Sequence, residues 1–423
     1  MGLERTLNLF DAMSIGIGAI IGAGIFVVLG IAIGYAGPSV IVSIIIAGVV
    51  AFFTAFSFAE LGSAIPKEGG VYVFAYELIS PFAAFPVGCL WLFAQIVAGA
   101  AISLGLASYF VAIFPAFSIK VVAISAALIL TGLNLLGIKQ SATVNNILVL
   151  VKIVILGLFI GFGIFQVHPQ YFSEFSPNGF WGILEGAGFI FFAYLGFGRI
   201  ATLGDEVKNP EKTLPLSILL SLTASIIIYI LTGFTAIGLQ DYRILAQSSS
   251  PIADAAAATG NYAIVAAVTL GALIATTSVL LTNLIGLSRV SFAMARNGQL
   301  PKSVAKTSSK FKTPYISILV MGALMATFVF LLDLKQTAAI TSFSILSTHV
   351  IVNLCTFRLR RKMPNSTTFK SPFYPILPLA GLISCSILMF SLPVESWIVA
   401  AFVVAISSVF YLLRSRDSSK GAG

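Results

Sequence analysis

Long runs of apolar residues, separated by short polar segments, make up most of the chain. The hydrocarbon core of a bilayer is about 30 Å thick, so a helix that crosses it needs roughly 20 apolar residues. Twelve runs reach this length, and we expect each to form a membrane-spanning helix. Their approximate limits are 9–35, 39–63, 81–114, 119–138, 146–166, 180–204, 214–239, 262–292, 314–333, 337–357, 373–392 and 394–413.

Glycine interrupts the first run. Gly16, Gly18, Gly22 and Gly24 lie close together there, and each glycine costs a helix about 1 kcal/mol relative to alanine. Two interpretations are open. A broken helix would present free amides and carbonyls to a solute, as in transporters, whereas small residues also allow helices to pack closely.

A second interruption, at Tyr194-Leu195-Gly196-Phe197-Gly198, lies in the sixth run. The third and eighth runs are the longest. Runs 1–5 and 6–10 therefore look like two halves of a repeat. Because each half has five spans, an odd number, the second half starts on the opposite side of the membrane and is inverted relative to the first. We expect a first repeat over 1–166, a second over 167–357, and two further helices with a tail over 358–423.

Composition and charge support a membrane protein. Of the 423 residues, 58% are hydrophobic and 9% are charged, whereas soluble proteins carry about 25% charged residues. With the N-terminus inside, nineteen of the 24 Lys and Arg residues fall on the inner side, and only Lys120, Arg243 and Lys335 fall outside. This asymmetry predicts a multi-pass plasma-membrane protein with both termini cytoplasmic. We attribute the net charge of +9 to anionic lipid rather than nucleic acid.

The chain lacks the motifs of an enzyme or an ATP-driven pump. No cluster of His, Cys and carboxylate residues has metal-ligand spacing, and no phosphate-binding Gly-x-x-x-x-Gly-Lys-Ser/Thr loop occurs. Cys89, Cys355 and Cys385 lie in apolar runs and fit small core residues. We expect no enzymatic activity, no cofactor and no metal.

Lys152 lies within the fifth run, which contains no acidic residue. A lysine in the middle of a membrane helix costs about 2.5–3.5 kcal/mol on insertion scales and is functional by default. The alternative is that its side chain extends to the cytoplasmic interface.

Five motifs resemble those of the amino acid–polyamine–organocation superfamily. They are Gly18–Phe26, Phe191–Phe197, Glu206–Pro210 followed by Leu214-Pro215, Ala293–Pro301, and Glu60-Leu61-Gly62 with Pro66 and Gly69–Tyr72. The resemblance runs from about residue 10 to 415, and Lys152 makes the chain most similar to prokaryotic relatives of cationic amino acid transporters. It implies an all-α leucine-transporter fold, with a five-plus-five inverted repeat, broken helices 1 and 6, and two extra helices.

The resemblance also implies where an amino acid binds. Amides of Ala23, Gly24 and Ile25 would hold the carboxylate, because a helix N-terminus favours anions. Ala23 and Phe192 are the candidates for side-chain selectivity. The carbonyls expected to accept the ammonium group are those of Ile20, Phe192, Ala193 and Leu195.

For Lys152 the resemblance implies the position that sodium occupies in sodium-coupled relatives. The expected cation-site contacts are Gly16 to Ala19 in helix 1 and Thr276, Thr277 and Ser278 in helix 8. Our hypothesis is that Lys152 gains and loses a proton as its burial changes between inward-open and outward-open states. A permanently charged strut is the alternative.

Gly198 and Arg199 depart from the family pattern, which usually has an acidic residue followed by a small one. Arg199 is a candidate inner gate, paired with Asp205, Glu206 or Glu60, or else it extends into the vestibule. Its charge opposes a cationic substrate. Glu185, near the start of the sixth run, is expected to cap that helix.

Taken together, these patterns predict a secondary active transporter that imports neutral amino acids with protons by alternating access. Its partners would be the amino acid, protons and the lipid bilayer, and the sequence makes no prediction of oligomeric state. The alternatives are a proton-independent exchanger or facilitator, a cationic amino acid carrier, a sodium-coupled carrier and a non-transporting sensor.

Overall fold

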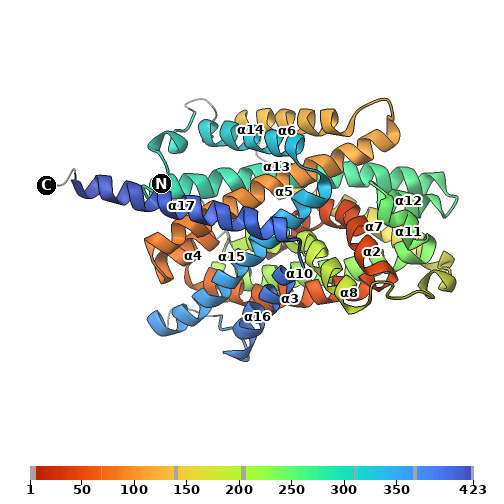
Figure 1. Ribbon diagram of the computed structural model, residues 1–423, viewed down its shortest axis with the longest axis horizontal. Helices are drawn as coiled ribbons and strands as arrows, with labels where there is room; N and C mark the ends of the chain where they lie inside the picture. The colour runs from red at the N-terminus through yellow and green to blue at the C-terminus, as the bar shows by residue number, and fades with distance from the viewer. Residues whose placement is uncertain are drawn as a thin grey trace.

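The computed structural model describes residues 6–67, 69–137, 142–201, 206–308, 311, 313–364 and 369–420. These residues form helices and connecting loops, with no β-strand among them (Figure 1). An isolated backbone bridge joins Leu7 to Val207. The all-helical prediction is therefore confirmed for the described part of the chain.

Each of the twelve predicted runs contains helix. The long helices are α3 (Val40–Ala64), α5 (Pro81–Ile113), α7 (Ala142–Gly163), α10 (Pro210–Leu239), α13 (Tyr262–Arg296), α15 (Leu334–Lys362) and α17 (Val394–Lys420). Three apolar helices are shorter: α6 (Ile119–Leu135), α14 (Tyr315–Leu331) and α16 (Ile376–Phe390). The sequence did not predict the short helices α4 (Val71–Leu78), α11 (Tyr242–Gln247) and α12 (Pro251–Ala257).

Eight helical stretches of the described chain are long and apolar enough to cross a membrane. One of them, Leu9–Ala64, has 56 residues and contains both of the first two predicted runs. The three shorter apolar helices have 15 to 17 residues, or about 22–26 Å at 1.5 Å per residue. The fold is that of a multi-pass membrane protein, and the number of twelve spans remains a prediction.

The predicted break in the first run is present. Helix α1 (Leu9–Ile20) starts at a capping box, in which the Asn8 side chain accepts a bond from the Asp11 amide and the Asp11 carboxylate accepts one from the Asn8 amide. It stops at Ile21, whose backbone is extended with φ −74° and ψ 99°. A π-helical turn, η1 (Gly24–Val28), then leads into α2 (Leu29–Ala36).

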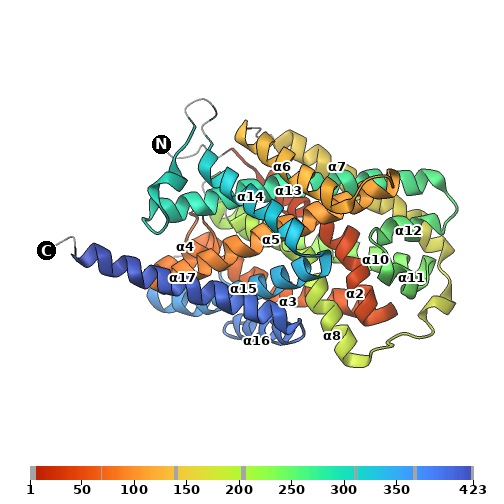
Figure 2. The same ribbon diagram turned by 45° about the horizontal axis from the view of Figure 1, so that its top comes forward.

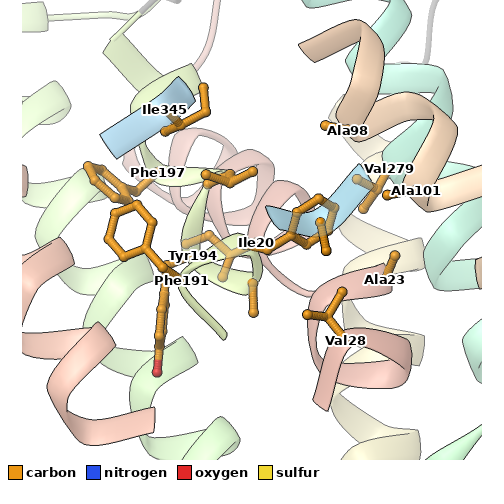
Figure 3. Packing of buried hydrophobic residues seen from close by; sticks show 14 of the residues in the cluster. Ile20, Ala23, Val28, Ala98, Ala101, Phe191, Tyr194, Phe197, Val279 and Ile345 are labelled. Carbon is orange, nitrogen blue, oxygen red and sulfur yellow. The ribbon is translucent and has the colours of Figure 1, made fainter. Parts of the chain in front are cut away.

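The second predicted break is also present. Helix α8 (Gly179–Ile190) passes into a 3-10 turn, η5 (Phe191–Tyr194), and after Leu195-Gly196 the chain continues as α9 (Phe197–Ile200). Figure 3 shows side chains from the two breaks, among them Ile20, Ala23, Phe191 and Tyr194, in one packed region.

The two breaks touch through glycine. A Cβ atom on Gly24 would collide with the backbone of Ala193, and one on Gly196 would collide with the backbone of Ala19 and Ile20. The glycines therefore serve both roles that the sequence left open, since they loosen the helix and also let the two irregular segments approach.

The remaining helices enclose these breaks. Helix α10 packs against both α1 and α3, while α5 packs against α13 and α15. In Figures 1 and 2, α5 runs through the bundle between α13 and α15, and α2 lies beside α8. The core thus forms around the interrupted segments, which positions their backbone groups away from the lipid-facing surface.

Candidate functional site

A small cavity lies between the two breaks. Its volume is about 20 Å³, which is enough for about one water molecule. Of the residues predicted to bind an amino acid, Ile20, Ala23, Gly24, Phe192 and Leu195 line it. The other lining residues are Ala19, Gly22, Ala98, Ile102, Arg199 and Val279.

The predicted residues Ile25 and Ala193 are not part of this lining, and the side chains of both are buried. A cavity of this size is too small for an amino acid. Phe192 is the largest apolar side chain of the lining, and a ligand would have to displace it or separate the breaks.

Tyr229 of α10 connects the two breaks. Its hydroxyl lies 2.7 Å from the Ile20 carbonyl oxygen and 3.2 Å from the Ala193 carbonyl oxygen. These are two of the carbonyls expected to accept an ammonium group. This role of Tyr229 was not predictable from the sequence, because a tyrosine in an apolar helix carries no signal that separates it from ordinary packing.

Lys152 of α7 is buried, with 1% of its surface exposed. Its ammonium group donates to the carbonyl oxygens of Gly18 at 2.8 Å and Ile21 at 3.0 Å. The alternative in which the side chain extends to the cytoplasmic interface is therefore wrong. The ammonium holds the last turn of α1, directly before the break.

Lys152 makes no hydrogen bond with the expected residues of helix 8. The hydroxyls of Thr276 and Ser278 bond instead to carbonyls of their own helix, those of Ala272 and Ala275, and Lys152 makes no hydrogen bond with Thr277. Gly16 lies against Ile200 and Ser221 rather than the lysine. The bond to Gly18 lies within the predicted helix 1 segment from Gly16 to Ala19, whereas a contact with Thr276, Thr277 or Ser278 of helix 8 stays a prediction.

A larger pocket of about 160 Å³ opens beside the small cavity. We call it the vestibule. Its lining residues are Leu7, Ile15, Ala19, Trp91, Ala142, Asn145, Arg199, Glu206, Thr282, Ile285, Gly286 and Arg289. Ala19 and Arg199 line both spaces, so the Arg199 side chain lies in the wall between the vestibule and the helix breaks.

Arg199 bonds to two neutral side chains across this wall. Its guanidinium donates to Gln95 Oε1 of α5 at 3.1 Å and to Thr282 Oγ1 of α13 at 3.4 Å. Asn283 in turn donates to the Gln95 carbonyl at 2.9 Å.

Glu60 has different partners from those expected. It is fully buried, Arg360 of α15 binds its carboxylate with Nε and Nη2, and the Ser371 amide donates to it at 2.9 Å. The predicted pairing of Arg199 with Glu60 is therefore wrong. Asp205, another expected partner, lies outside the described residues.

A charged pair and a backbone bridge join residues that line the vestibule. Arg289 of α13 pairs with Glu206 at 2.5 Å, so Glu206 is bound here rather than to Arg199. The Leu7 amide donates to the Glu206 carbonyl, and the Lys208 amide donates to the Leu7 carbonyl. The segment before α1 is thus tied to the loop after α9.

Comparison with known proteins identifies the family. Residues 11–413 match the amino acid permease family model. The chain is 33% identical to the methylthioribose transporter of Bacillus subtilis (strain 168), over 99% of this chain and 95% of that protein. It is also 33% identical to the branched-chain amino acid permease BcaP of the same organism, over 99% and 94% of the two chains.

A plant relative extends the comparison. The vacuolar cationic amino acid transporter 4 of Arabidopsis thaliana is 32% identical, over 87% of this chain and 65% of that protein. The broken helices, the buried lysine and these matches agree with the family resemblance of the sequence motifs. The chain belongs to the amino acid permease family and is a multi-pass membrane transporter rather than an enzyme.

Proposed function

We propose that the protein imports neutral amino acids together with protons, by alternating access around the two helix breaks. The main support for this proposal is the small cavity between the breaks. It is lined by residues at the start of η1, by residues of the η5 segment and by Arg199. The amides of Ala23, Gly24 and Ile25 would bind the carboxylate, because amides in the first turn of a helix have no intrahelical acceptor.

The ammonium group would bind at the carbonyls of Ile20, Phe192, Ala193 and Leu195. The Tyr229 hydroxyl supports this, since it lies within hydrogen-bond distance of two of these carbonyls, and each carbonyl oxygen has a second lone pair for another donor. Apolar surface from Ala98, Ile102 and Val279 lines the same cavity. Such a wall suits an aliphatic side chain, in keeping with a branched-chain amino acid permease among the relatives.

Lys152 is the proposed coupling residue. It has no acidic partner among the described residues, so its ammonium form depends on the carbonyls of Gly18 and Ile21. Those carbonyls belong to the end of α1. If α1 moves as the inner side opens, the ammonium loses its acceptors, and burial without acceptors favours the neutral amine. Proton release would then accompany substrate release.

We further propose the leucine-transporter fold, with twelve spans and both termini cytoplasmic in the plasma membrane. The repeats would be 1–166 and 167–357, with 358–423 outside them. Arg199 would act as an inner gate, now with Gln95 and Thr282 as partners. Its charge between the vestibule and the cavity favours neutral over cationic substrates, although a relative named as a cationic amino acid transporter keeps that alternative open.

The test is uptake of a radiolabelled amino acid panel into sodium-free proteoliposomes, with and without an inward proton gradient. We expect accumulation of neutral amino acids that the gradient stimulates. Lys152→Ala should lose the stimulation. The matched control is Lys67→Ala, which removes an exposed lysine paired with Glu77 and should leave the stimulation unchanged.

Each alternative has its own outcome. Uptake indifferent to the gradient in both proteins would favour an exchanger or facilitator over proton coupling. Uptake restored only by sodium would favour a sodium-coupled carrier. Preferential uptake of lysine and arginine would assign a cationic substrate, and saturable binding without uptake would indicate a sensor.

A further inference from the structure

A second pocket lies at the end of the bundle away from the vestibule. Its volume is about 350 Å³, within the range of about 300–1,000 Å³ that ligand sites occupy. We call it the distal pocket. It is lined by Tyr35, Trp181, Glu185, Phe189, Phe390, Ser391, Leu392, Pro393 and Val394.

Three elements build the distal pocket, and two of them carry the outer halves of the broken helices. Tyr35 is near the end of α2, Trp181 and Glu185 are in α8, and Phe390 ends α16. Figure 1 and Figure 2 both show α2 beside α8. Asn178 donates to the Tyr35 carbonyl at 2.7 Å, which ties the start of α8 to the end of α2.

The third element is fixed in the same way. The Ser391 hydroxyl lies 3.0 Å from the Leu184 carbonyl, which holds the turn between α16 and α17 against α8. Hydrogen bonds therefore hold all three elements of the pocket in place.

Glu185 supplies a negative charge to this pocket. Helix α8 begins at Gly179 and has no acidic residue in its first turn, so the expectation that Glu185 caps the helix is wrong. Its half-buried carboxylate makes no hydrogen bond or ion pair with any residue that the structure describes. A carboxylate held in an aromatic pocket without a partner is a natural acceptor for an ammonium group.

Lys335, an exposed residue that is not part of the lining, supplies the opposite charge beside the pocket. Its ammonium lies 4.9 Å from the centroid of the Tyr35 ring, which lines the pocket together with Glu185. The two groups form no ion pair, so a positive and a negative group remain separate at one aromatic wall. Tyr35 also stacks on Phe189, with ring centroids 5.0 Å apart, which fixes the wall.

The aromatic side chains add a further attraction for cations. Ring faces attract ammonium groups, and the Lys335 ammonium lies over the Tyr35 ring in this way. Trp181 and Phe390 are 66% and 68% exposed. Exposed tryptophan at the end of an apolar helix is typical of the membrane–water interface, which places the distal pocket at headgroup level.

We propose that the distal pocket binds a zwitterion, with its ammonium group at Glu185 and the aromatic wall and its anionic group at Lys335. Two sources share this chemistry, namely the phosphoethanolamine headgroup of a membrane lipid and a free amino acid. A zwitterion bound in the distal pocket would link α2 to α8 and to the turn after α16. Binding would therefore favour the arrangement of α2 and α8 that the structure has. The lipid arm of this inference is independent of the proposed function.

The test uses the purified full chain in detergent. Melting temperature is measured while a short-chain phosphatidylethanolamine is added, and separately with phosphatidylglycerol of the same acyl chains. We expect only the ethanolamine lipid to raise the melting temperature. Glu185→Gln and Lys335→Gln should each remove at least half of that rise. Glu174→Gln is the matched control, because Glu174 pairs with Arg243 away from the pocket, and it should keep the full rise.

A second measurement separates the two sources. Equilibrium binding of radiolabelled leucine gives the number of molecules bound per chain. If the chain binds a second leucine and Glu185→Gln loses it, the pocket binds an amino acid. If the variants change only the rise in melting temperature with the ethanolamine lipid, the pocket binds the headgroup. Trp181→Ala replaces Glu185→Gln if the latter does not fold.

The inference is overturned if the two lipids act alike in every protein and leucine stoichiometry does not depend on Glu185. Complete absence of leucine binding would count against the proposed function instead, while the lipid measurement would still decide the distal pocket.

Discussion

The Tyr229 hydroxyl lies 2.7 Å from the carbonyl oxygen of Ile20, at the end of the first half-helix. The same hydroxyl is 3.2 Å from the Ala193 carbonyl in the second break. A phenol has one proton, so it donates to one carbonyl at a time and holds both within reach. This contact couples the two breaks at the point where we place the substrate ammonium.

Tyr229→Phe should therefore lower stability and weaken substrate binding together. Loss of the hydroxyl leaves a buried carbonyl unpaired, which costs about 1–3 kcal/mol, and leaves the two acceptors without a common anchor. The measurements are melting temperature and leucine affinity. Tyr194→Phe is the control, because its hydroxyl bonds to the Ile44 carbonyl at 3.2 Å, and it should lose stability without a change in affinity. Equal affinities in all three proteins would contradict a role for Tyr229 in the site.

Gly24→Ala should separate the two breaks. The new Cβ would meet the backbone of Ala193, which cannot rotate away as a flexible side chain can. Overpacking of this kind costs about 1–3 kcal/mol, and we expect leucine binding to be lost or strongly reduced. Gly157→Ala is the control, since nothing lies within 4 Å of its Cβ position in α7. It should be neutral or stabilise by up to about 1 kcal/mol.

Arg289→Ala should open the vestibule. The pair of Arg289 with Glu206 is partly exposed, with side chains 31% and 22% accessible, so its contribution is about 1 kcal/mol or less. That corresponds to an increase of up to about fivefold in the open population. The measurement is alkylation of a cysteine placed at Ile285 in the vestibule, in a background without native cysteines. Arg243→Ala, which breaks a pair with Glu174 outside the vestibule, should not change the alkylation rate.

Glu60→Gln should destabilise the chain more than any exposed pair does. Glu60 is fully buried and bonds to both Arg360 and the Ser371 amide. Removal of one partner from a buried ion pair costs about 3–5 kcal/mol, because the remaining charge is left uncompensated. Thermal unfolding in detergent measures the effect. Glu77→Gln, which breaks an exposed pair with Lys67, should cost about 1 kcal/mol or less, and a similar loss in the two variants would contradict this account.

Both helix breaks were predictable from the sequence because backbone preference is local. Glycine loosens a helix wherever it stands, and the first break falls at Ile21, inside the glycine-rich segment. Lys152 was also identifiable, because a charge in an apolar run is rare enough to indicate function. Its acceptor at Gly18 lies in the predicted helix 1 segment.

Partners of buried polar groups were harder to predict. The bonds of Arg199 to Gln95 and Thr282, on two other helices, were not predicted from the sequence. Glu60 pairs with Arg360, 300 residues further along the chain. The partner of a buried polar group depends on the angle and distance at which two helices cross, and the local sequence does not specify that geometry.

The sequence by itself determined the membrane class, the positions of the two breaks and the presence of a lysine between apolar neighbours. Hydropathy and backbone preference decide these features within a few residues of each position. Only the tertiary structure decided which groups meet at the breaks. Tyr229 is 209 residues from Ile20 in the chain, and Ala193 reaches Gly24 through the packing of two separate helices. Contacts of this kind follow from the shape of the folded bundle, because burial and distance are set there and not along the chain.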